Sequence, residues 1–224
     1  AEARIKDSEE EVFGELRVTT TIGFGSLWLA PRLARLYAKY PDLKIDLMLE
    51  ERVLDLPMRE ADVAIRMKEP SQADLIRKRL MTVRMRLFAT KEYLDLRGAP
   101  KRMEDLAHHR LICQNVRSTQ VGAAASMVNA LMSYEIDSLL TVNNYFGVLQ
   151  ATLNNLGIGV LPEYVANDFP QLIPLLEEAD SGDIPVFLAY PEELRHSKRI
   201  GAFRDFVQDE ISAYRKQVKN QRFE

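Results

Sequence analysis

The 224-residue sequence has little of the chemistry on which many enzymes depend. It contains one cysteine, Cys113, and three histidines, His108, His109 and His196. A single cysteine excludes a disulfide within the chain and favours a reducing compartment. Adjacent histidines point apart on any regular element, and His196 lies far along the chain, so no spacing matches a metal site. Because a serine nucleophile elbow is also absent, we expect no metal, no catalytic residues and no enzymatic activity.

Long apolar runs and an excess of positive charge are absent as well. No run approaches the roughly 18 apolar residues of a membrane span, and no signal peptide opens the chain. The net charge of −3 argues against nucleic-acid binding by this segment alone. Residues 66–102 nevertheless carry eleven Lys or Arg against four Asp or Glu. This segment indicates either strands with one solvated, charged face or an electropositive surface that attracts an anionic effector.

Strand and helix patterns alternate along the chain, which predicts an α/β fold with parallel strands and crossover helices. The first part predicts a strand at 14–20, a helix over 27–40, a strand near 44–50, a short helix around 53–59 and a buried strand at 61–67. The second part predicts strands at 75–81, 83–90, 111–115, 138–144, 158–162 and 185–191, helices over 145–156 and 163–168, and a long helix from about 197. No flexible tether separates the two parts, so we expect two similar lobes that share strands.

A polar turn follows the first strand, in "VTTTIGFGSLWLAP" (residues 18–31). A dinucleotide fingerprint needs a third glycine where Trp28 stands, and the turn has no lysine for a phosphate-cradling loop. We therefore expect no nucleotide cofactor. The remaining groups suit a carboxylate or phosphate: the Thr19, Thr20 and Thr21 hydroxyls, two glycines and a helix start with free N–H groups. The alternative is a strand end that is simply finished with polar β-branched residues.

Two further strands end in polar residues. The strand in "LICQN" ends in Gln114 and Asn115. The strand in "LTVNNYF" ends in Asn143 and Asn144, directly before a helix start. Ligands of open α/β sheets lie at the carboxyl ends of strands, so we predict that Thr20, Thr21, Gln114 and Asn144 line one polar site. Asparagine is also an ordinary helix N-cap, which is the structural alternative for Asn144.

Cys113 lies in the same strand as Gln114. An apolar strand cysteine is usually buried and inert, whereas a redox sensor needs a thiol with a lowered pKa. The sequence leaves both roles open.

Several motifs together resemble the effector-binding domain of LysR-type transcriptional regulators. They occur in family order between about residues 14 and 210: "GELRVTTTIGFGSLWLAPRLARLYAKYPDLKIDLML", "MREADVAIRM", "LNNLGIGVLPEYVA" and "FLAYPEELRHSKRIGAFRDFV". The resemblance implies a periplasmic-binding-protein-like fold, in which two Rossmann-like lobes are joined by two crossover strands. A small-molecule effector would bind in the cleft between the lobes.

The resemblance also implies how the chain is divided. Residues 1–13 would be the tail of a linker helix, which fits a chain that does not begin with methionine. Residues 14–88 would form the first lobe, residues 89–186 the second, and residues 187–224 would return to the first. The family's DNA-binding winged helix-turn-helix is absent from this sequence, so DNA would be bound only through that missing domain.

Carried onto this sequence, the family's effector contacts fall at four strand ends and helix starts. These residues are Thr20, Thr21, Ile22, Gly23, Phe24, Arg66, Met67, Gln114, Asn115, Asn144, Tyr145 and Phe146. One departure matters, because many members have serine or threonine where this sequence has Gly23 and Phe24.

Two predicted helices carry more apolar surface than one core covers. Leu27, Trp28 and Tyr37 widen the apolar arc of helix 27–40, while Tyr145, Val148 and Thr152 do the same for helix 145–156. The resemblance implies that these helices pack against each other across a homodimer, and that the full-length protein is a tetramer.

We therefore interpret the chain as the effector-sensing domain of a cytoplasmic bacterial transcription regulator, without membrane association. The alternative is a periplasmic solute-binding protein for amino or carboxylic acids.

Overall fold

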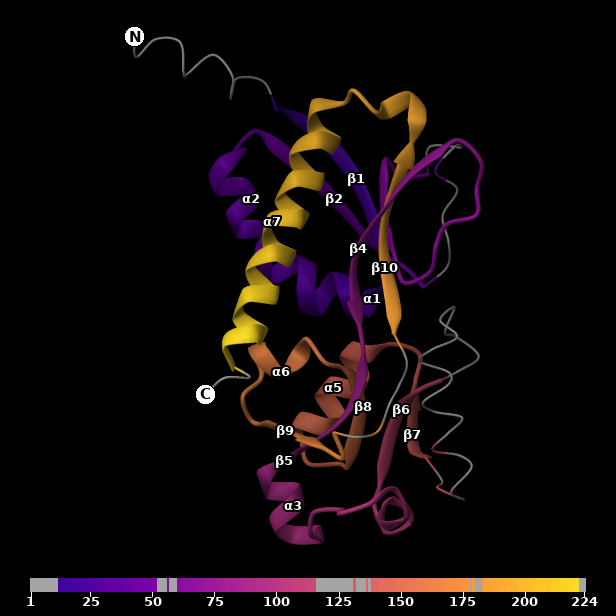
Figure 1. Cartoon of the computed structure of the whole chain (residues 1–224), viewed down its shortest axis with the longest axis vertical. Helices are drawn as coiled ribbons and strands as arrows, with labels where there is room; N and C mark the ends of the chain where they lie inside the picture. The colour runs from indigo at the N-terminus through magenta and orange to yellow at the C-terminus, as the bar shows by residue number, and fades with distance from the viewer. Residues whose placement is uncertain are drawn as a thin grey trace. The chain divides into compact units, whose positions relative to one another are not determined.

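The computed structural model describes residues 12–51, 56, 60–115, 131, 136, 138–177, 179 and 183–221 (Figure 1). Two compact units make up the chain. Unit 1 comprises residues 1–21, 29–81 and 186–224, and unit 2 comprises residues 22–28 and 82–185. Each unit contains one five-stranded mixed sheet with helices, so the α/β class is confirmed.

The sheet of unit 1 has the order β2-β1-β3-β10-β4. Its strands are β1 (Gly14–Thr20), β2 (Leu43–Leu49), β3 (Val63–Arg66), β4 (Leu75–Val83) and β10 (Ile184–Pro191). Strand β1 runs parallel to both β2 and β3, whereas β10 is antiparallel to β3. Along β1, alternate residues Leu16 and Val18 are almost fully buried, as expected for a strand whose apolar side chains pack into a core.

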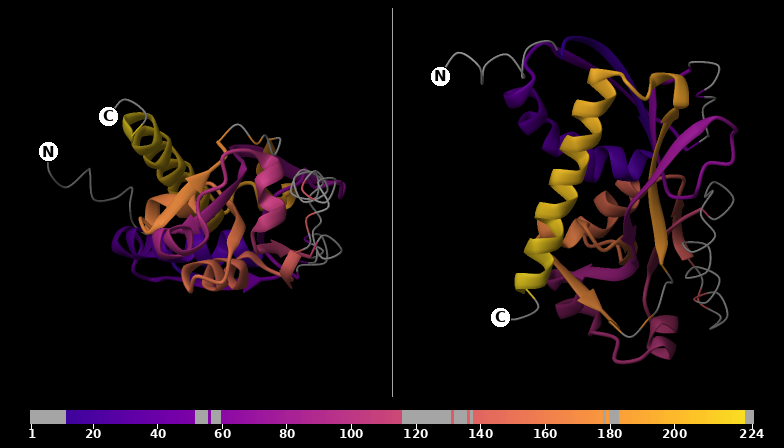
Figure 2. Two further views of the ribbon diagram at one scale, coloured as in Figure 1. Left: turned by 90° about the horizontal axis from the view of Figure 1, so that it is seen from below. Right: turned by 45° about the horizontal axis from the view of Figure 1, so that its top comes forward.

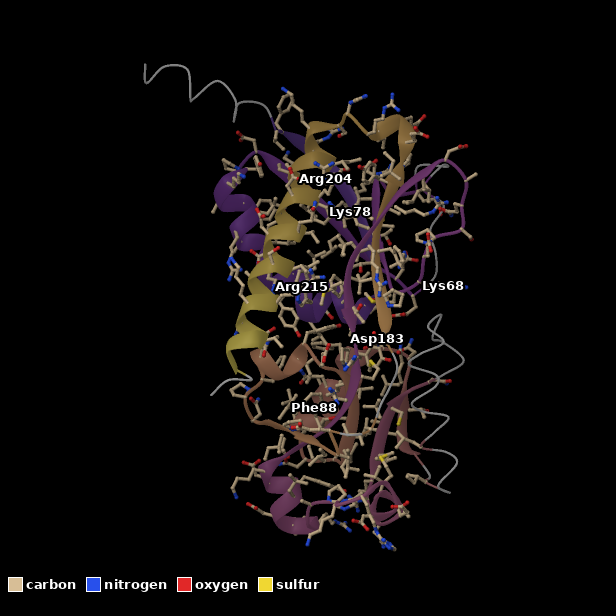
Figure 3. All side chains as sticks on the ribbon, in the orientation of Figure 1. Lys68, Lys78, Phe88, Asp183, Arg204 and Arg215 are labelled. Atoms are coloured by element: carbon tan, nitrogen blue, oxygen red, sulfur yellow. The ribbon has the colours of Figure 1, made fainter. Side chains whose placement is uncertain are left out.

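Helix α7 (Lys198–Gln221) supplies one long apolar face to unit 1. The five residues that the helical period predicts for this face are all buried: Ile200, Phe203, Phe206, Val207 and Tyr214. Helix α2 (Leu33–Lys39) lies beside α7 in Figure 1 and in the right view of Figure 2, and Arg35 on α2 pairs with Glu210 on α7. Hydrogen bonds also link α7 to β4. Lys78 on β4 donates to Gln208 at 2.5 Å, and Arg215 donates to the Leu80 carbonyl at 2.9 Å; Lys78 and Arg215 are labelled in Figure 3.

The sheet of unit 2 has the order β7-β6-β8-β5-β9. Its strands are β5 (Met85–Thr90), β6 (Leu111–Gln114), β7 (Ser138–Val142), β8 (Ile158–Pro162) and β9 (Leu172–Leu175). Strand β6 is parallel to β7 and β8, and β5 is antiparallel to β8 and β9. Phe88, labelled in Figure 3, is buried at the centre of β5.

Close helix–strand packing organises unit 2. Besides the helical turns within residues 22–28, its helices are α3 (Lys91–Arg97), η4 (Met103–His108), α5 (Tyr145–Leu153) and α6 (Val165–Asp168). A methyl group added at Gly159 on β8 would lie 2.1 Å from the Thr152 hydroxyl of α5, and one at Gly157 would lie 2.3 Å from the Arg110 carbonyl. Both separations are too short for real atoms. Gly159 therefore lets α5 approach β8 closely, and Gly157 lets the backbone before β8 approach the backbone before β6.

The predicted helix over 27–40 is wrong as a single element. The chain instead forms α1 (Ile22–Phe24), a π-helical turn η2 (Gly25–Leu29), a 3₁₀ turn η3 (Ala30–Arg32) and then α2. Pro31 lies at the start of η3, where its missing N–H and fixed φ interrupt a regular α-helix. The last described turn of this kind, η5 (Glu192–Leu194), precedes α7.

Other sequence expectations differ from the structure in detail. Neither sheet consists of parallel strands only, because each also contains antiparallel pairs. Strand β9 was not predicted from the sequence. It is a four-residue strand containing Pro174, and it lies at the edge of its sheet, where proline is tolerated. Residues 82–88 belong to unit 2 because β5 pairs with β8 and β9, and residues 22–28 belong to unit 2 as well. The expected linker tail and the helix around 53–59 fall largely outside the described residues.

Candidate functional site

The first group of predicted site residues lies at one edge of the unit 1 sheet. Because β1 and β3 are parallel, Thr20 and Arg66 end their strands at the same edge. The Arg66 guanidinium donates from Nη2 to the Thr19 hydroxyl at 2.8 Å and from Nη1 to the Glu50 carbonyl at 2.9 Å. One arginine therefore connects the ends of β1, β2 and β3.

Arg66 is a buried cation, with only 5% of its surface exposed. Burial lowers the pKa of its guanidinium, while the charges of Glu51 and Glu50 oppose this shift. An arginine keeps its proton at any ordinary pH, so the site retains a positive charge. Arg66 Nε and Thr20 Oγ1 are both buried with no hydrogen-bond partner among the described residues. Each such group costs on the order of 1–3 kcal/mol unless a bound molecule satisfies it.

In unit 2, Gly23 allows an aromatic ring to pack closely on α1. A methyl group added at Gly23 would lie 3.0 Å from Tyr145 Cδ2 and 3.2 Å from Tyr145 Cβ. The neighbouring Phe24 is 1% exposed, stacks on Trp28 at a centroid distance of 4.8 Å and meets Tyr164 edge-on at 5.9 Å. Phe24 is therefore a core residue, and the region between α1 and α5 is bounded by the ring of Tyr145.

Helix α5 begins next to this contact with a side-chain cap. The Asn144 Oδ1 accepts a hydrogen bond from the Gly147 N–H at 3.0 Å, so the N-cap alternative is confirmed for Asn144. Its Nδ2 donates to the Asn143 side chain at 2.9 Å, and Gln114 Nε2 donates to the Asn143 carbonyl at 3.0 Å. The ends of the parallel strands β6 and β7 thus share one amide network.

The remaining predicted residues differ in exposure. Thr21, Ile22 and Met67 are half-buried, whereas Asn115 and Phe146 are exposed. Thr20, Thr21, Arg66 and Met67 belong to unit 1, and the other eight candidates belong to unit 2. A polar site shared by Thr20, Thr21, Gln114 and Asn144 consequently stays a prediction.

Two backbone groups in these networks belong to residues outside the predicted site. The Glu50 carbonyl accepts from Arg66, and the Asn143 carbonyl accepts from Gln114. Both are backbone oxygens, which any residue type supplies, so no sequence signal could have found them. Thr19 was noted only as part of a hydroxyl cluster, although its place directly before the strand end could have suggested a partner role.

The chemistry of the remaining candidates is limited. Cys113 lies on β6 and is 3% exposed, and a redox role for it stays a prediction. Among the residues that the structure describes, no group of three or more His, Cys, Asp or Glu could hold a metal ion. No described helix combines the length and the apolar character that crossing a membrane requires.

Four of the residues predicted to widen the apolar arcs of the dimer helices are buried instead. Leu27, Trp28, Val148 and Thr152 are at most 5% exposed, because they pack inside the chain rather than widening an outer face. Of the large apolar side chains on these elements, Tyr37 (38%) and Phe146 (47%) are the exposed ones in the described part of the chain.

The family known as the LysR substrate binding domain matches residues 9–212. The chain belongs to this family. An uncharacterized HTH-type transcriptional regulator of Haemophilus influenzae is 27% identical over 199 residues, which are 88% of this chain and 69% of that protein. The HTH-type transcriptional regulator CrgA of Neisseria meningitidis serogroup C is 29% identical over 205 residues, 88% of this chain and 67% of that protein.

Solved structures agree with the sequence relatives. The structure of CrgA from Neisseria meningitidis superposes with a TM-score of 0.78 at 25% identity, covering 94% of this chain and 72% of that one. The CrgA regulatory domain alone gives a TM-score of 0.72 and is covered to 99%. The LysR resemblance and the periplasmic-binding-protein-like fold are thereby confirmed, and a periplasmic solute-binding protein is not favoured. The chain spans from half to about two thirds of the length of such regulators.

Proposed function

We propose that this LysR substrate-binding domain senses a small polar or anionic effector and passes the signal to a DNA-binding domain elsewhere in the whole protein. One observation carries the proposal. Both sheets place polar groups at the carboxyl ends of neighbouring parallel strands: Thr20 and Arg66 in unit 1, and Gln114 and Asn144 in unit 2. Ligands of open α/β sheets bind at such strand ends.

The candidate contacts have the chemistry that such an effector needs. The buried Thr20 hydroxyl can donate or accept, and the Gln114 and Asn144 amides offer both kinds of group. The start of α5 adds backbone N–H groups, which favour a carboxylate or phosphate. The ring of Tyr145, seated on Gly23, would provide an apolar wall beside them.

A thermal-shift screen of small organic acids, amino acids and phosphorylated metabolites tests this proposal. We expect at least one class to raise the melting temperature, because a ligand that binds only the folded state stabilises it. If compounds of all three classes leave the melting temperature unchanged at millimolar concentration, the proposed effector chemistry is wrong.

A double variant then tests the residues. Thr20→Val with Gln114→Leu removes two buried polar groups with little change in volume, and should weaken binding of the first compound found by roughly 1–3 kcal/mol. Ser212→Ala is the matched control, since this exposed hydroxyl lies on α7 and bonds to the Gln208 carbonyl of the same helix. Unchanged affinity in the double variant would remove these residues from the site.

The whole protein would act in the cytoplasm as a regulator that binds DNA, and not as an enzyme, since its relatives are transcriptional regulators.

We also propose a homodimer through the elements over 27–40 and 145–156, and a tetramer in the full-length protein. The exposed Tyr37 and Phe146 support a contact there. Light scattering at micromolar concentration tests the dimer: a mass of 25.6 kDa at every concentration would exclude it for this domain.

A further inference from the structure

Arg66 connects three strands at the edge of the sheet where the polar turn begins. It ends β3, its Nη2 bonds to Thr19 near the end of β1, and its Nη1 bonds to the Glu50 carbonyl directly after β2. The Glu50 N–H in turn donates to the Thr20 carbonyl at 2.9 Å. These bonds form a closed set around the last residues of β1, from which the chain continues into residues 21–24.

The geometry of this set requires an arginine. A guanidinium is planar and holds its N–H groups in a fixed fork, so it can reach a hydroxyl and a carbonyl at once. A lysine carries its three donors on a single nitrogen, so it could bond to both acceptors only if both lay within hydrogen-bond distance of that one atom. A neutral apolar residue of similar length would satisfy neither acceptor.

The hydrogen bonds of Arg66 indicate that it acts within the sheet. Each of its two terminal nitrogens already donates to a protein acceptor, the Thr19 hydroxyl or the Glu50 carbonyl. Its two hydrogen-bond partners, a hydroxyl and a carbonyl, are neutral, while Glu50 and Glu51 act on it through charge. A buried cation is costly to keep, and here it is used to hold strand ends in place.

We propose that Arg66 is a positioning residue, which acts through Thr19 and the Glu50 backbone to hold the end of β1 and the turn that follows it in one conformation. Its connection to ligand binding rests on the proposed function, but its action on the strand ends does not. This replaces the direct effector contact that the family resemblance implies for Arg66.

Hydrogen exchange of the ligand-free protein tests the proposal. Arg66→Met and Arg66→Lys should each speed exchange of the Glu50 amide roughly ten- to hundredfold, because both lose the forked bonds that close this edge. The Asp62 amide donates to the Arg17 carbonyl in the same sheet at 2.9 Å and should keep its rate. Arg35→Met is the matched control, since it removes an arginine of unit 1 whose partner is Glu210 on α7.

The outcomes separate a positioning role from the alternatives. If Arg66→Met speeds the Asp62 and Glu50 amides equally, the role is general stabilisation and the proposal fails. If Arg66→Lys restores the wild-type Glu50 rate, charge rather than forked geometry is what matters, and the proposal fails again. The thermal-shift screen tests the proposed function separately, since a wild-type protein that binds nothing would refute effector sensing without changing these exchange rates.

Discussion

In unit 1 a charged side chain joins the strand ends, whereas in unit 2 the absence of side chains at three glycines allows close packing. Arg66 bonds to Thr19 and to the Glu50 carbonyl in unit 1. In unit 2, Gly23, Gly157 and Gly159 each leave space into which Tyr145, Arg110 and Thr152, respectively, are packed. The first arrangement fails when a bond is removed, and the second fails when an atom is added. The two units are therefore sensitive to opposite kinds of substitution: removal of a polar side chain in unit 1, and addition of a side chain at a glycine in unit 2.

The largest effect is expected where a glycine meets backbone. Gly157→Ala would place a methyl group 2.3 Å from the Arg110 carbonyl oxygen, which cannot move without shifting the start of β6. We expect a loss of about 2–3 kcal/mol in the free energy of unfolding, at the upper end of overpacking costs. Urea denaturation measures this loss.

Gly201 provides the matched control in unit 1. It lies in α7, and a methyl group there would meet nothing within 4 Å. Gly201→Ala should therefore stabilise the protein by up to about 1 kcal/mol through helix propensity. Equal effects of the two substitutions would contradict the contrast between the units.

The ion pair on α7 should have the next largest effect. Glu210 is 6% exposed and lies between Arg35 and Arg32, the latter at 3.8 Å. Glu210→Gln keeps the shape but removes the charge, so we expect a loss of about 1–3 kcal/mol. Asp183→Asn in unit 2 breaks an exposed pair with Arg84 at 2.9 Å and should cost less than about 1 kcal/mol. Chemical denaturation of both variants would show whether buried charge is the greater stabiliser.

The side-chain cap of α5, in unit 2, should contribute less to the stability of the protein. Asn144→Ala leaves the Gly147 N–H without its side-chain acceptor and should cost about 1 kcal/mol. Asn144→Asp retains the acceptor and places a negative charge at the helix start, so it should match or exceed the wild-type stability. Thermal denaturation of the two variants checks this order, which a purely steric role for residue 144 would not produce.

The smallest expected effect is a pH dependence in unit 2. The Tyr93 hydroxyl accepts from the Arg110 N–H at 3.0 Å and lies 3.3 Å from His109 Nδ1, where the tautomer of the imidazole decides which atom donates. Burial lowers the pKa of His109, and the charges of His108 and Arg97 add to this shift while that of Asp105 opposes it.

The sign of the pH effect follows from this lowered pKa. Below the unfolded-state pKa of about 6.5, the unfolded chain binds more protons than the folded one. The contribution of His109 to stability is therefore complete above that pH and decreases as the pH falls through the folded-state value. His109→Gln should flatten this part of the stability curve between pH 7 and 5, whereas His108→Gln should leave it in place. A curve unchanged by His109→Gln would assign the pH dependence to other groups.

The sequence by itself determined the class of fold and the family. Apolar alternation in β1 and the 3.6-residue period of α7 needed no tertiary information, because each reports which face of one element is buried. The polar strand ends were also visible, and Asn144 could be identified as a cap from its place before a helix. These features depend on neighbours within a few residues.

The tertiary structure decided which of those residues act together. Only the pairing of β1, β2 and β3 brings Arg66 to the Thr19 hydroxyl and the Glu50 carbonyl. Only the packing of α1 on α5 shows that Gly23 makes room for Tyr145 and that Phe24 belongs to the core. The edge strand β9 also depends on such a long-range contact, its pairing with β5. Partners 16 to 122 residues apart in the chain leave no local pattern, because their contact depends on how strands pair and helices pack rather than on the spacing of residues within one element.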